Sequence, residues 1–250
     1  MLVNLTSQDS IAVLSLANGA ANPISPALAA DLNSALDDVE NDRECRGLVL
    51  TSESEKFFSI GFDIPSLYPI DEKGFLEFFR TFNRACLRLF TLPAPTACAV
   101  TGHATAGGCI LALMCDYRYM VEGRKWIGLN EIKLGVPVPL LPELALRMIC
   151  GDRVATEMLY TGEFLDGNAA AKVKLVDEVT PPQDVFGKAL DKVKSIGGYY
   201  ARAFKAIKEN RVTSVRDEYL KRQEADNQRF LDMWYDERTR EGLAEAMKKY

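Results

Sequence analysis

The chain has 250 residues, of which 48% are hydrophobic and 26% charged, and its formal net charge at pH 7 is −5. This composition is typical of one large soluble globular domain, or of one domain with a small appendage. The acidic balance argues against a nucleic-acid partner or an anionic membrane surface, and no apolar stretch approaches the ~20 residues that span a bilayer.

Six cysteines are scattered along the chain without a CxxC pair, and the chain has one histidine. Zinc sites need clustered ligands, so we expect no metal site and interpret the cysteines as reduced, mostly buried side chains in a reducing compartment. The first residues carry no positively charged leader, and the C-terminal sequence MKKY differs from the Ser-Lys-Leu peroxisomal signal. We therefore predict a cytoplasmic protein.

Strand and helix patterns alternate through most of the chain. Residues 1 to 19 alternate as a hairpin that turns at 7 to 10, and residues 22 to 42 have the leucine spacing of a helix. The patterns that follow predict strands at 46–52, 95–102, 117–122 and 174–181, a strand running into a glycine turn at 56–67, a short strand and loop at 126–135, and helices at 74–93, 107–116 and 140–171. The alternation from 46 to 180 predicts βαβ units and a mostly parallel sheet.

The tail from residue 184 to 250 is almost entirely helical in pattern and rich in charge. Basic residues such as Lys205 and Lys208 are expected on a solvated helix face. The residues expected to form a buried stripe are Leu220, Phe230, Leu231 and Trp234. We divide the chain into a core domain, residues 1–190, and a helical C-terminal region, residues 191–250.

The segment VTGHATAGGCILALMCDY, residues 100 to 117, places a strand, a glycine turn and a helix in succession, which is the arrangement of an anion site. The lysine of a phosphate-binding P-loop is missing, and GxGxxG follows none of the predicted strands. A developing oxyanion needs only one or two N–H groups in a dry site, and a second exposed turn at Gly61 and Phe62 could supply one of them. From the residues alone, this interpretation and two plain helix starts remain equally open.

Four segments together resemble the crotonase (enoyl-CoA hydratase/isomerase) superfamily: KFFSIGFDI, AVTGHATAGGCILALMCDYR, WIGLNEIKLGV and LVDEVTP, in this order and spacing. Within that superfamily the chain looks most like the monofunctional Δ3,Δ2-enoyl-CoA isomerases of fatty acid β-oxidation. The resemblance implies an α/β fold, the ClpP-like crotonase spiral of ββα units, with a helical C-terminal trimerisation region. It also implies an acyl-CoA substrate, no separate cofactor, and a homotrimer or hexamer.

The resemblance also implies roles for individual residues. The backbone N–H groups of Phe62 and Gly107 match the family's oxyanion hole, and Glu131 matches one of the two hydratase glutamates. The position of the other glutamate holds Ile110 in this chain. Substrate contacts are implied at Ser59, Gly61, Phe62, Asp63, Ile64 and Ile110.

The replacement of one glutamate by Ile110 favours isomerisation over hydration. Adding water across a double bond needs one group for the water and another for the proton at the α carbon, whereas moving a double bond needs a single base. We therefore predict an enoyl-CoA isomerase with Glu131 as its proton carrier. The alternatives are another single-carboxylate enolate-forming acyl-CoA enzyme and a catalytically inactive acyl-CoA-binding subunit, with a hydratase ranked lower.

Three further residues are expected to have structural roles. His103 lies at a strand–helix turn where its ring can satisfy nearby backbone groups, and Asp116 is expected to cap or pair. Lys174 stands where the family usually has a glycine.

Overall fold

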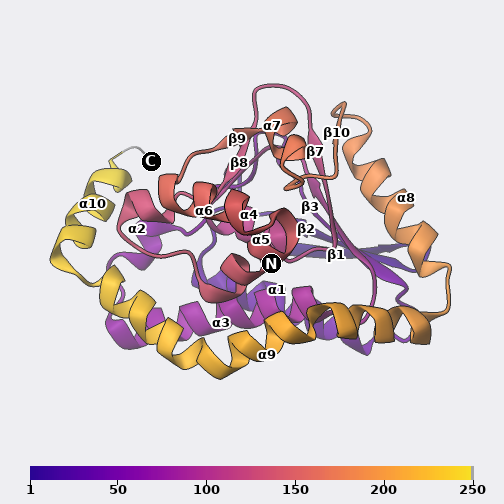
Figure 1. The fold of residues 1–250 in the computed structure, drawn as a ribbon, viewed down its shortest axis with the longest axis horizontal. Helices are drawn as coiled ribbons and strands as arrows, with labels where there is room; N and C mark the ends of the chain where they lie inside the picture. Colours follow the sequence, from indigo (N-terminus) through magenta and orange to yellow (C-terminus); the bar gives the residue numbers. More distant parts are fainter. Residues whose placement is uncertain (249–250) are drawn as a thin grey trace.

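The computed structural model describes residues 1–248 and contains a six-stranded sheet at its centre (Figure 1). The first two strands form the predicted antiparallel hairpin, which turns at Asp9 and Ser10, both with positive φ. The other neighbours in this sheet run parallel, as the alternating pattern predicts. In spatial order the strands are β1 (Val3–Gln8), β2 (Ile11–Leu16), β3 (Gly47–Ser52), β5 (Thr96–Val100), β7 (Tyr117–Val121) and β10 (Glu178–Thr180).

A second, smaller sheet gives the fold its spiral. Its strands in spatial order are β4 (Phe57–Ser59), β6 (His103–Thr105), β8 (Trp126–Gly128) and β9 (Leu165–Asp166). Strands β3, β5 and β7 of the large sheet are each followed along the chain by a strand of the small one, so that successive ββα units wind around a shared core. The sequence pattern predicts a turn at the position of β6 and a helix at that of β9. Strands this short do not show a detectable alternation of apolar and polar residues.

The helices fill and cover the two sheets. Helix α8 packs Val185, Ala189 and Val193 on one face of the large sheet, while α1, α3 and α4 belong to the main core. The helices are α1 (Pro26–Asn41), α2 (Ile64–Leu67), α3 (Glu72–Thr91), α4 (Gly107–Leu113), the 3₁₀ helix η1 (Glu131–Leu134), α5 (Leu140–Cys150), α6 (Asp152–Thr161), α7 (Gly167–Lys172), α8 (Val185–Gly197), α9 (Ala201–Trp234) and α10 (Glu237–Met247). Within residues 1–248, no helix combines the length and apolarity needed to cross a bilayer.

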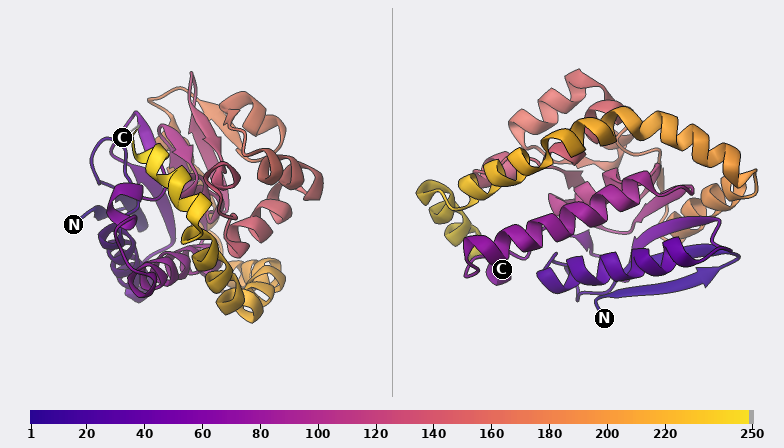
Figure 2. Two further views of the ribbon diagram at one scale, coloured as in Figure 1. Left: turned by 90° about the vertical axis from the view of Figure 1, so that its left-hand side faces the viewer. Right: turned by 90° about the horizontal axis from the view of Figure 1, so that it is seen from below.

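The long helix α9 lies beside α3 and turns into α10 at one end of the molecule (Figures 1 and 2). Phe230 stacks on Phe79 with ring centroids 4.2 Å apart, and Trp234 stacks on Phe75 at 4.4 Å. Burial of Phe230, Leu231 and Trp234 agrees with the predicted stripe, but Leu220 is 42% exposed, so its inclusion was wrong. The stripe is covered by this chain's own α3, and the division at residue 190 stays a prediction.

The other end of α9 is fastened to the large sheet through buried charges. Lys208 is 3% exposed, and its Nζ lies 2.8 Å from Asp116 and 3.1 Å from the Ala94 carbonyl oxygen. Asp116 also accepts hydrogen bonds from the backbone N–H and the hydroxyl of Thr96, which confirms its expected pairing. The prediction that Lys208 lies on a solvated face was therefore wrong. The charged residues of α9 are spread around the helix, so its sequence does not indicate which lysine is buried against a partner.

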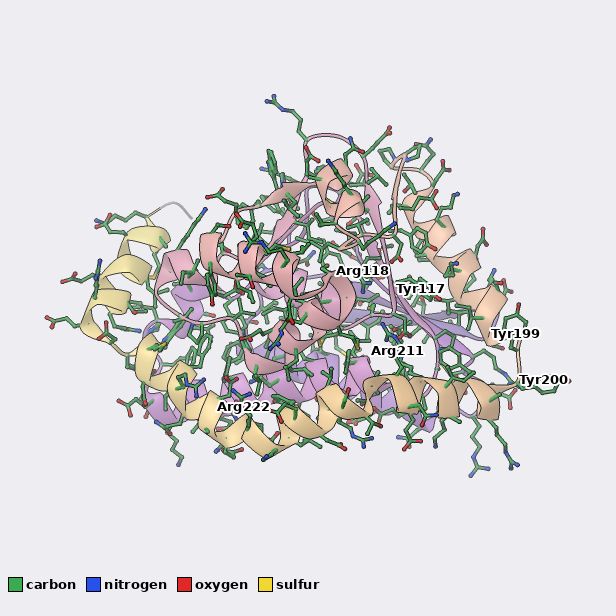
Figure 3. The ribbon with its side chains drawn as sticks, in the orientation of Figure 1. Tyr117, Arg118, Tyr199, Tyr200, Arg211 and Arg222 are labelled. Atoms are coloured by element: carbon green, nitrogen blue, oxygen red, sulfur yellow. The ribbon has the colours of Figure 1, made fainter. Side chains whose placement is uncertain are left out.

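A buried arginine holds the neighbouring strand end. The Arg118 guanidinium, 3% exposed, donates to the carbonyl oxygens of Leu175 and Cys115 at 2.7 and 2.6 Å. Figure 3 shows Arg118, Tyr117 and Arg211 gathered where α9 passes the sheet, with Tyr199 at the corner between α8 and α9. This junction fixes where α9 starts its path across the core.

We expect Lys208→Ala to lower the free energy of unfolding by about 3 kcal/mol, because breaking a buried ion pair leaves one charge without its partner. The value lies at the lower end of the usual range since Arg211 stays 3.6 Å from Asp116. Lys205 is exposed on the same helix, and Lys205→Ala should change stability by no more than about 0.5 kcal/mol. Urea unfolding of both variants checks this, and equal effects would contradict it.

Candidate functional site

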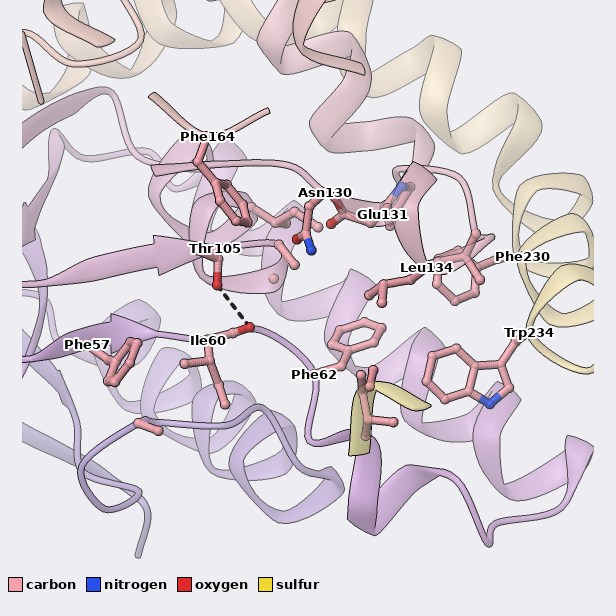
Figure 4. A pocket seen from close by; sticks show the side chains of 18 of the residues that line it. Phe57, Ile60, Phe62, Thr105, Asn130, Glu131, Leu134, Phe164, Phe230 and Trp234 are labelled. Carbon is pink, nitrogen blue, oxygen red and sulfur yellow. Dashed lines mark hydrogen bonds between the residues drawn. The ribbon is translucent and has the colours of Figure 1, made fainter. Parts of the chain in front are cut away.

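A cavity of about 620 Å³ lies between the end of β4, the start of α4, η1 and the α9–α10 corner (Figure 4). Of the residues singled out in the sequence as candidates for the site, the structure places five on its walls: Phe62, Ile64, Gly107, Ile110 and Glu131. These residues come from three separate segments of the chain, which the two sheets bring to one place.

Two glycine turns meet at one wall of this cavity. Gly61 has φ +91°, and a Cβ built on it would lie 2.9 Å from the backbone nitrogen of Gly107. A Cβ on Gly108 would lie only 2.3 Å from the carbonyl oxygen of Ser59. The end of β4 and the start of α4 therefore approach backbone to backbone, which side chains at these positions would prevent.

The meeting of the turns leaves backbone donors at the cavity. The N–H of Phe62 donates to no other backbone group within residues 1–248. On either side of it, the Gly61 carbonyl oxygen accepts from the N–H of Ile24, and the N–H of Asp63 donates to the Ile24 carbonyl oxygen. Gly107 is the first residue of α4, so its N–H has no acceptor inside the helix. Both residues line the cavity, and the positive end of the helix dipole favours negative charge at Gly107.

Glu131 opens η1, and its side chain is held in the interior. It is 5% exposed, and its Oε2 has no hydrogen-bond partner among the described residues. Lys133, the neighbouring cation, pairs with Glu163 instead at 2.6 Å. Burial raises the pKa of Glu131 to about 8, and a backbone hydrogen bond lowers it by a smaller amount.

The surroundings of Glu131 in the cavity are largely apolar, with one amide. Ile110, 1% exposed, presents a hydrocarbon surface from α4. Asn130 lies beside Glu131 (Figure 4); it precedes η1 without capping it, and its Oδ1 is buried with no partner within residues 1–248. Glu131 thus has the single side-chain carboxyl group among the described lining residues, and sequence reasoning missed Asn130.

Other predicted contacts lie outside the cavity lining. Ser59 shapes the turn: its hydroxyl donates to the carbonyl oxygen of Asn22 at 2.7 Å and accepts from the N–H of Gly61 at 3.1 Å. Asp63 precedes α2. As substrate contacts, Ser59, Gly61 and Asp63 stay predictions.

His103 has the structural environment expected for it. Its Nδ1 accepts a hydrogen bond from the backbone N–H of Trp126 at 3.1 Å. Burial, followed by the charges of Lys125 and Lys56, lowers its pKa. Within residues 1–248, no group of three or more His, Cys, Asp or Glu side chains is placed to hold a metal ion.

The far end of the cavity is formed by residues that the sequence placed only on a buried stripe. Phe230 and Trp234 of α9 reach the lining, together with Ala246 of α10. No local signal links these positions to residues 56–139, because their contact depends on the path of α9 across α3. A helical residue's tertiary partner cannot be read from helical spacing alone.

The buried carboxyl makes stability depend on pH. Glu131 keeps its proton up to about pH 8 in the folded protein, but loses it near pH 4.5 once unfolded. The unfolded state therefore binds fewer protons between these values, and this residue's contribution to stability falls as pH rises, by at most about 1.4 kcal/mol per pH unit. We expect Glu131→Gln to gain stability relative to the parent across this window. Urea unfolding of both proteins at several pH values checks this, and a pH-independent difference would contradict it.

Comparison with known proteins shows the family to which the chain belongs. The model of the family described as enoyl-CoA hydratase/isomerase matches residues 6–249. The chain is 32% identical over 231 residues to a Mus musculus protein named enoyl-CoA delta isomerase 1, mitochondrial, covering 92% of this chain and 80% of that one. It is 37% identical over 184 residues to a putative enoyl-CoA hydratase of Thermus thermophilus, covering 72% and 70%.

A solved structure shows the same fold from end to end. The crystal structure of human mitochondrial delta3-delta2-enoyl-CoA isomerase matches with a TM-score of 0.96 at 26% identity, covering 100% of this chain and 98% of that one. The fold class and the family resemblance predicted from the sequence are thereby confirmed. The chain belongs to the enoyl-CoA hydratase/isomerase family, the crotonase superfamily of acyl-CoA enzymes.

Proposed function

We propose that the chain is a Δ3,Δ2-enoyl-CoA isomerase, which moves the double bond of a 3-enoyl-CoA to give the trans-2-enoyl-CoA. The observation that carries this proposal is the buried Glu131, the one acidic side chain among the described lining residues, with Ile110, Phe62 and Gly107 lining the same cavity. The isomerase names of the mouse and human relatives support it, while the Thermus relative carries a hydratase name.

In the proposed reaction, Glu131 acts as both base and acid. Its carboxylate removes a proton from the α carbon of the thioester, and the electron pair delocalises over the thioester oxygen and the neighbouring double bond. The protonated carboxyl returns a proton to the γ carbon, which leaves the double bond between the α and β carbons. A pKa of about 8 suits both steps near neutral pH, because neither protonation state is strongly disfavoured.

The intermediate needs its negative charge held between the two proton transfers. The N–H groups of Phe62 and Gly107 are proposed to donate to the thioester oxygen. Donors of this kind act strongly in a site with few competing waters, and they need no reorganisation as charge develops. The apolar surface of Ile110 contributes by offering no group that could hold or activate a water molecule.

Other functions remain as alternatives to the isomerase. Another single-carboxylate enzyme that forms an acyl-CoA enolate would use the same Glu131 and the same donors. A catalytically inactive acyl-CoA-binding subunit would have no need for a carboxyl buried at 5% exposure beside free backbone donors. We also propose, from family membership, a homotrimer or hexamer. The cytoplasmic location stays a prediction from the sequence signals.

The proposed base is tested by Glu131→Gln, which keeps the side-chain volume and removes the basicity. We expect kcat for a 3-enoyl-CoA to fall by about 10²–10⁴-fold, the usual contribution of a general base. In the parent, kcat/KM should rise with pH up to an apparent pKa near 8, because the deprotonated carboxylate starts the reaction.

Glu163→Gln is the matched control, since Glu163 is an exposed carboxylate that pairs with Lys133. It should leave both the rate and the pH profile close to those of the parent. A Glu131→Gln protein with activity within a few-fold of the parent would rule out the assignment. No isomerase activity in the parent would favour the alternatives.

The proposed oxyanion hole is tested by Gly61→Ala. The new Cβ would lie 2.9 Å from the Gly107 nitrogen, so the two turns must move apart and at least one donor is displaced. We expect kcat to fall by about 10²–10³-fold, the cost of losing one such donor.

Gly123→Ala is the control for backbone strain. Gly123 has φ +97°, similar to that of Gly61, but no atom lies within 4 Å of a Cβ built there. Turnover of Gly123→Ala should match the parent. Circular dichroism checks that each variant is folded. A folded Gly61→Ala protein with unchanged kcat would contradict the proposed oxyanion hole.

A further inference from the structure

The backbone that carries Glu131 is joined to the segment that follows it, residues 135–139, which we name the connecting segment. The carbonyl oxygen of Glu131 accepts a hydrogen bond from the N–H of Val136 at 3.2 Å. Gly135 ends η1 with φ +83°, and Pro137 and Pro139 each fix their own φ. A shift of this stiff connecting segment would therefore displace Glu131 as well.

On its outer side, η1 faces solvent and has weak support. Ile132 is 53% exposed. Lys133 pairs with Glu163, but the two side chains are 45% and 71% exposed, and ion pairs of this kind contribute little stability. The position of Glu131 therefore depends more on contacts at the inner side of the connecting segment.

Thr239 of α10 contacts the start of the connecting segment. It is buried, and its hydroxyl donates to the carbonyl oxygen of Gly135 at 3.2 Å. A Cβ built on Gly135 would lie 2.6 Å from Oγ1 of Thr239, so the threonine packs directly against the glycine backbone. The cap of α10, Asp236, accepts from the N–H of Thr239 at 3.3 Å and fixes the threonine in the first turn of its helix.

Asp226 of α9 holds the other end of the connecting segment. It is buried, and its Oδ2 accepts from the N–H of Leu140 at 3.0 Å. Leu140 is the first residue of α5, so this N–H has no acceptor inside its own helix, and Pro139 supplies no side-chain cap. Burial raises the pKa of Asp226, and the hydrogen bond from Leu140 is the largest influence that lowers it. The carboxylate and the start of α5 therefore stabilise each other.

We propose that Thr239 and Asp226 are positioning residues for Glu131: they hold the two ends of the connecting segment and thereby fix the carboxyl group in the cavity. The inference rests on the proposed use of Glu131 as the proton carrier. A proton carrier must lie within reach of two carbon atoms of one substrate, so a small displacement of its backbone lowers the rate. Neither positioning residue is among the described lining residues of the cavity, so both act through the connecting segment.

The test uses pairs of variants at the two positions. Thr239→Val keeps nearly the same shape and removes the donor, whereas Thr239→Ser keeps the hydroxyl. Asp226→Ala removes the acceptor, whereas Asp226→Asn keeps a carbonyl oxygen. The matched controls on α9 are Thr213→Val and Asp232→Ala, because both side chains form their hydrogen bonds within their own helix.

Hydrogen–deuterium exchange measures the hold on η1 without any substrate. The N–H groups of Lys133, Gly135 and Val136 donate to carbonyl oxygens of residues 130–132. In Thr239→Val and Asp226→Ala, we expect exchange in peptides covering residues 131–140 to become about fivefold faster, the usual effect of one lost hydrogen bond. Exchange in β3, β5 and β7 should stay as in the parent. Thr239→Ser, Asp226→Asn and both controls should exchange as the parent does.

Kinetics then show whether this hold matters for the reaction. With a 3-enoyl-CoA, we expect kcat to fall by about 10–10²-fold in Thr239→Val and Asp226→Ala, since a displacement of about 1 Å can cost that much. KM, and the Kd of octanoyl-CoA measured by calorimetry, should change by less than about threefold, because the lining residues are intact. Thr239→Ser and Asp226→Asn should restore kcat to within a few-fold of the parent.

Three outcomes would overturn the inference: unchanged exchange at residues 131–140, faster exchange throughout the large sheet, and an unchanged kcat in variants whose exchange is faster only at residues 131–140. Thr239→Val removes a single hydroxyl, so the test does not depend on Asp226→Ala being folded. Faster exchange confined to residues 131–140 and reversed by Thr239→Ser, in a parent without isomerase activity, would support the hold on Glu131 and refute the proposed function.

Discussion

The site depends on a backbone-to-backbone contact between the end of β4 and the start of α4. Gly61 faces the nitrogen of Gly107, and Gly108 faces the carbonyl oxygen of Ser59, at distances that leave no room for a Cβ. This contact places two strand-end turns from neighbouring strands of the small sheet side by side. Phe62 and Gly107, one from each turn, then line one cavity, and their N–H groups are the donors that we propose for the oxyanion hole.

The second constraint is the burial of Glu131, whose carboxyl group loses hydration on folding. Burial raises its pKa to about 8, and its Oε2 has no hydrogen-bond partner within residues 1–248. The neighbouring Lys133, which could have lowered it, is taken up by Glu163 on the surface. The aromatic stacking of α9 on α3 supplies apolar burial that offsets the cost of such a group.

Much of the fold and part of the site could be predicted from the sequence because their signals are local. The strand, glycine turn and helix of residues 100–117 lie in one uninterrupted segment, and so does the hairpin. Lys174, at the position where the family usually has a glycine, adopts φ +67°, in the left-handed region that favours glycine. Positions of Phe62, Gly107 and Glu131 came from the family resemblance, and the sheets then place them on one cavity.

What could not be predicted depends on the path of one long helix. Helix α9 is charged along most of its length, so its sequence does not indicate that Lys208 is buried, or that Leu220 is exposed. The same holds for Trp234, whose role in the cavity wall follows from the crossing of α9 over α3. Asn130 was missed for another reason: an asparagine before a helix is expected to cap it, and here it does not.

The wall at the α9–α10 turn has a consequence for local unfolding of the C-terminal helices. Phe230, Trp234 and Ala246 belong to the same chain as Glu131, and the turn is fastened to that chain through Tyr235 and its hydrogen bond to Ile70. These described lining residues at the apolar end therefore come from the chain that carries Glu131. Local unfolding of the α9–α10 turn would remove these residues from the cavity, so binding at that end would oppose such unfolding.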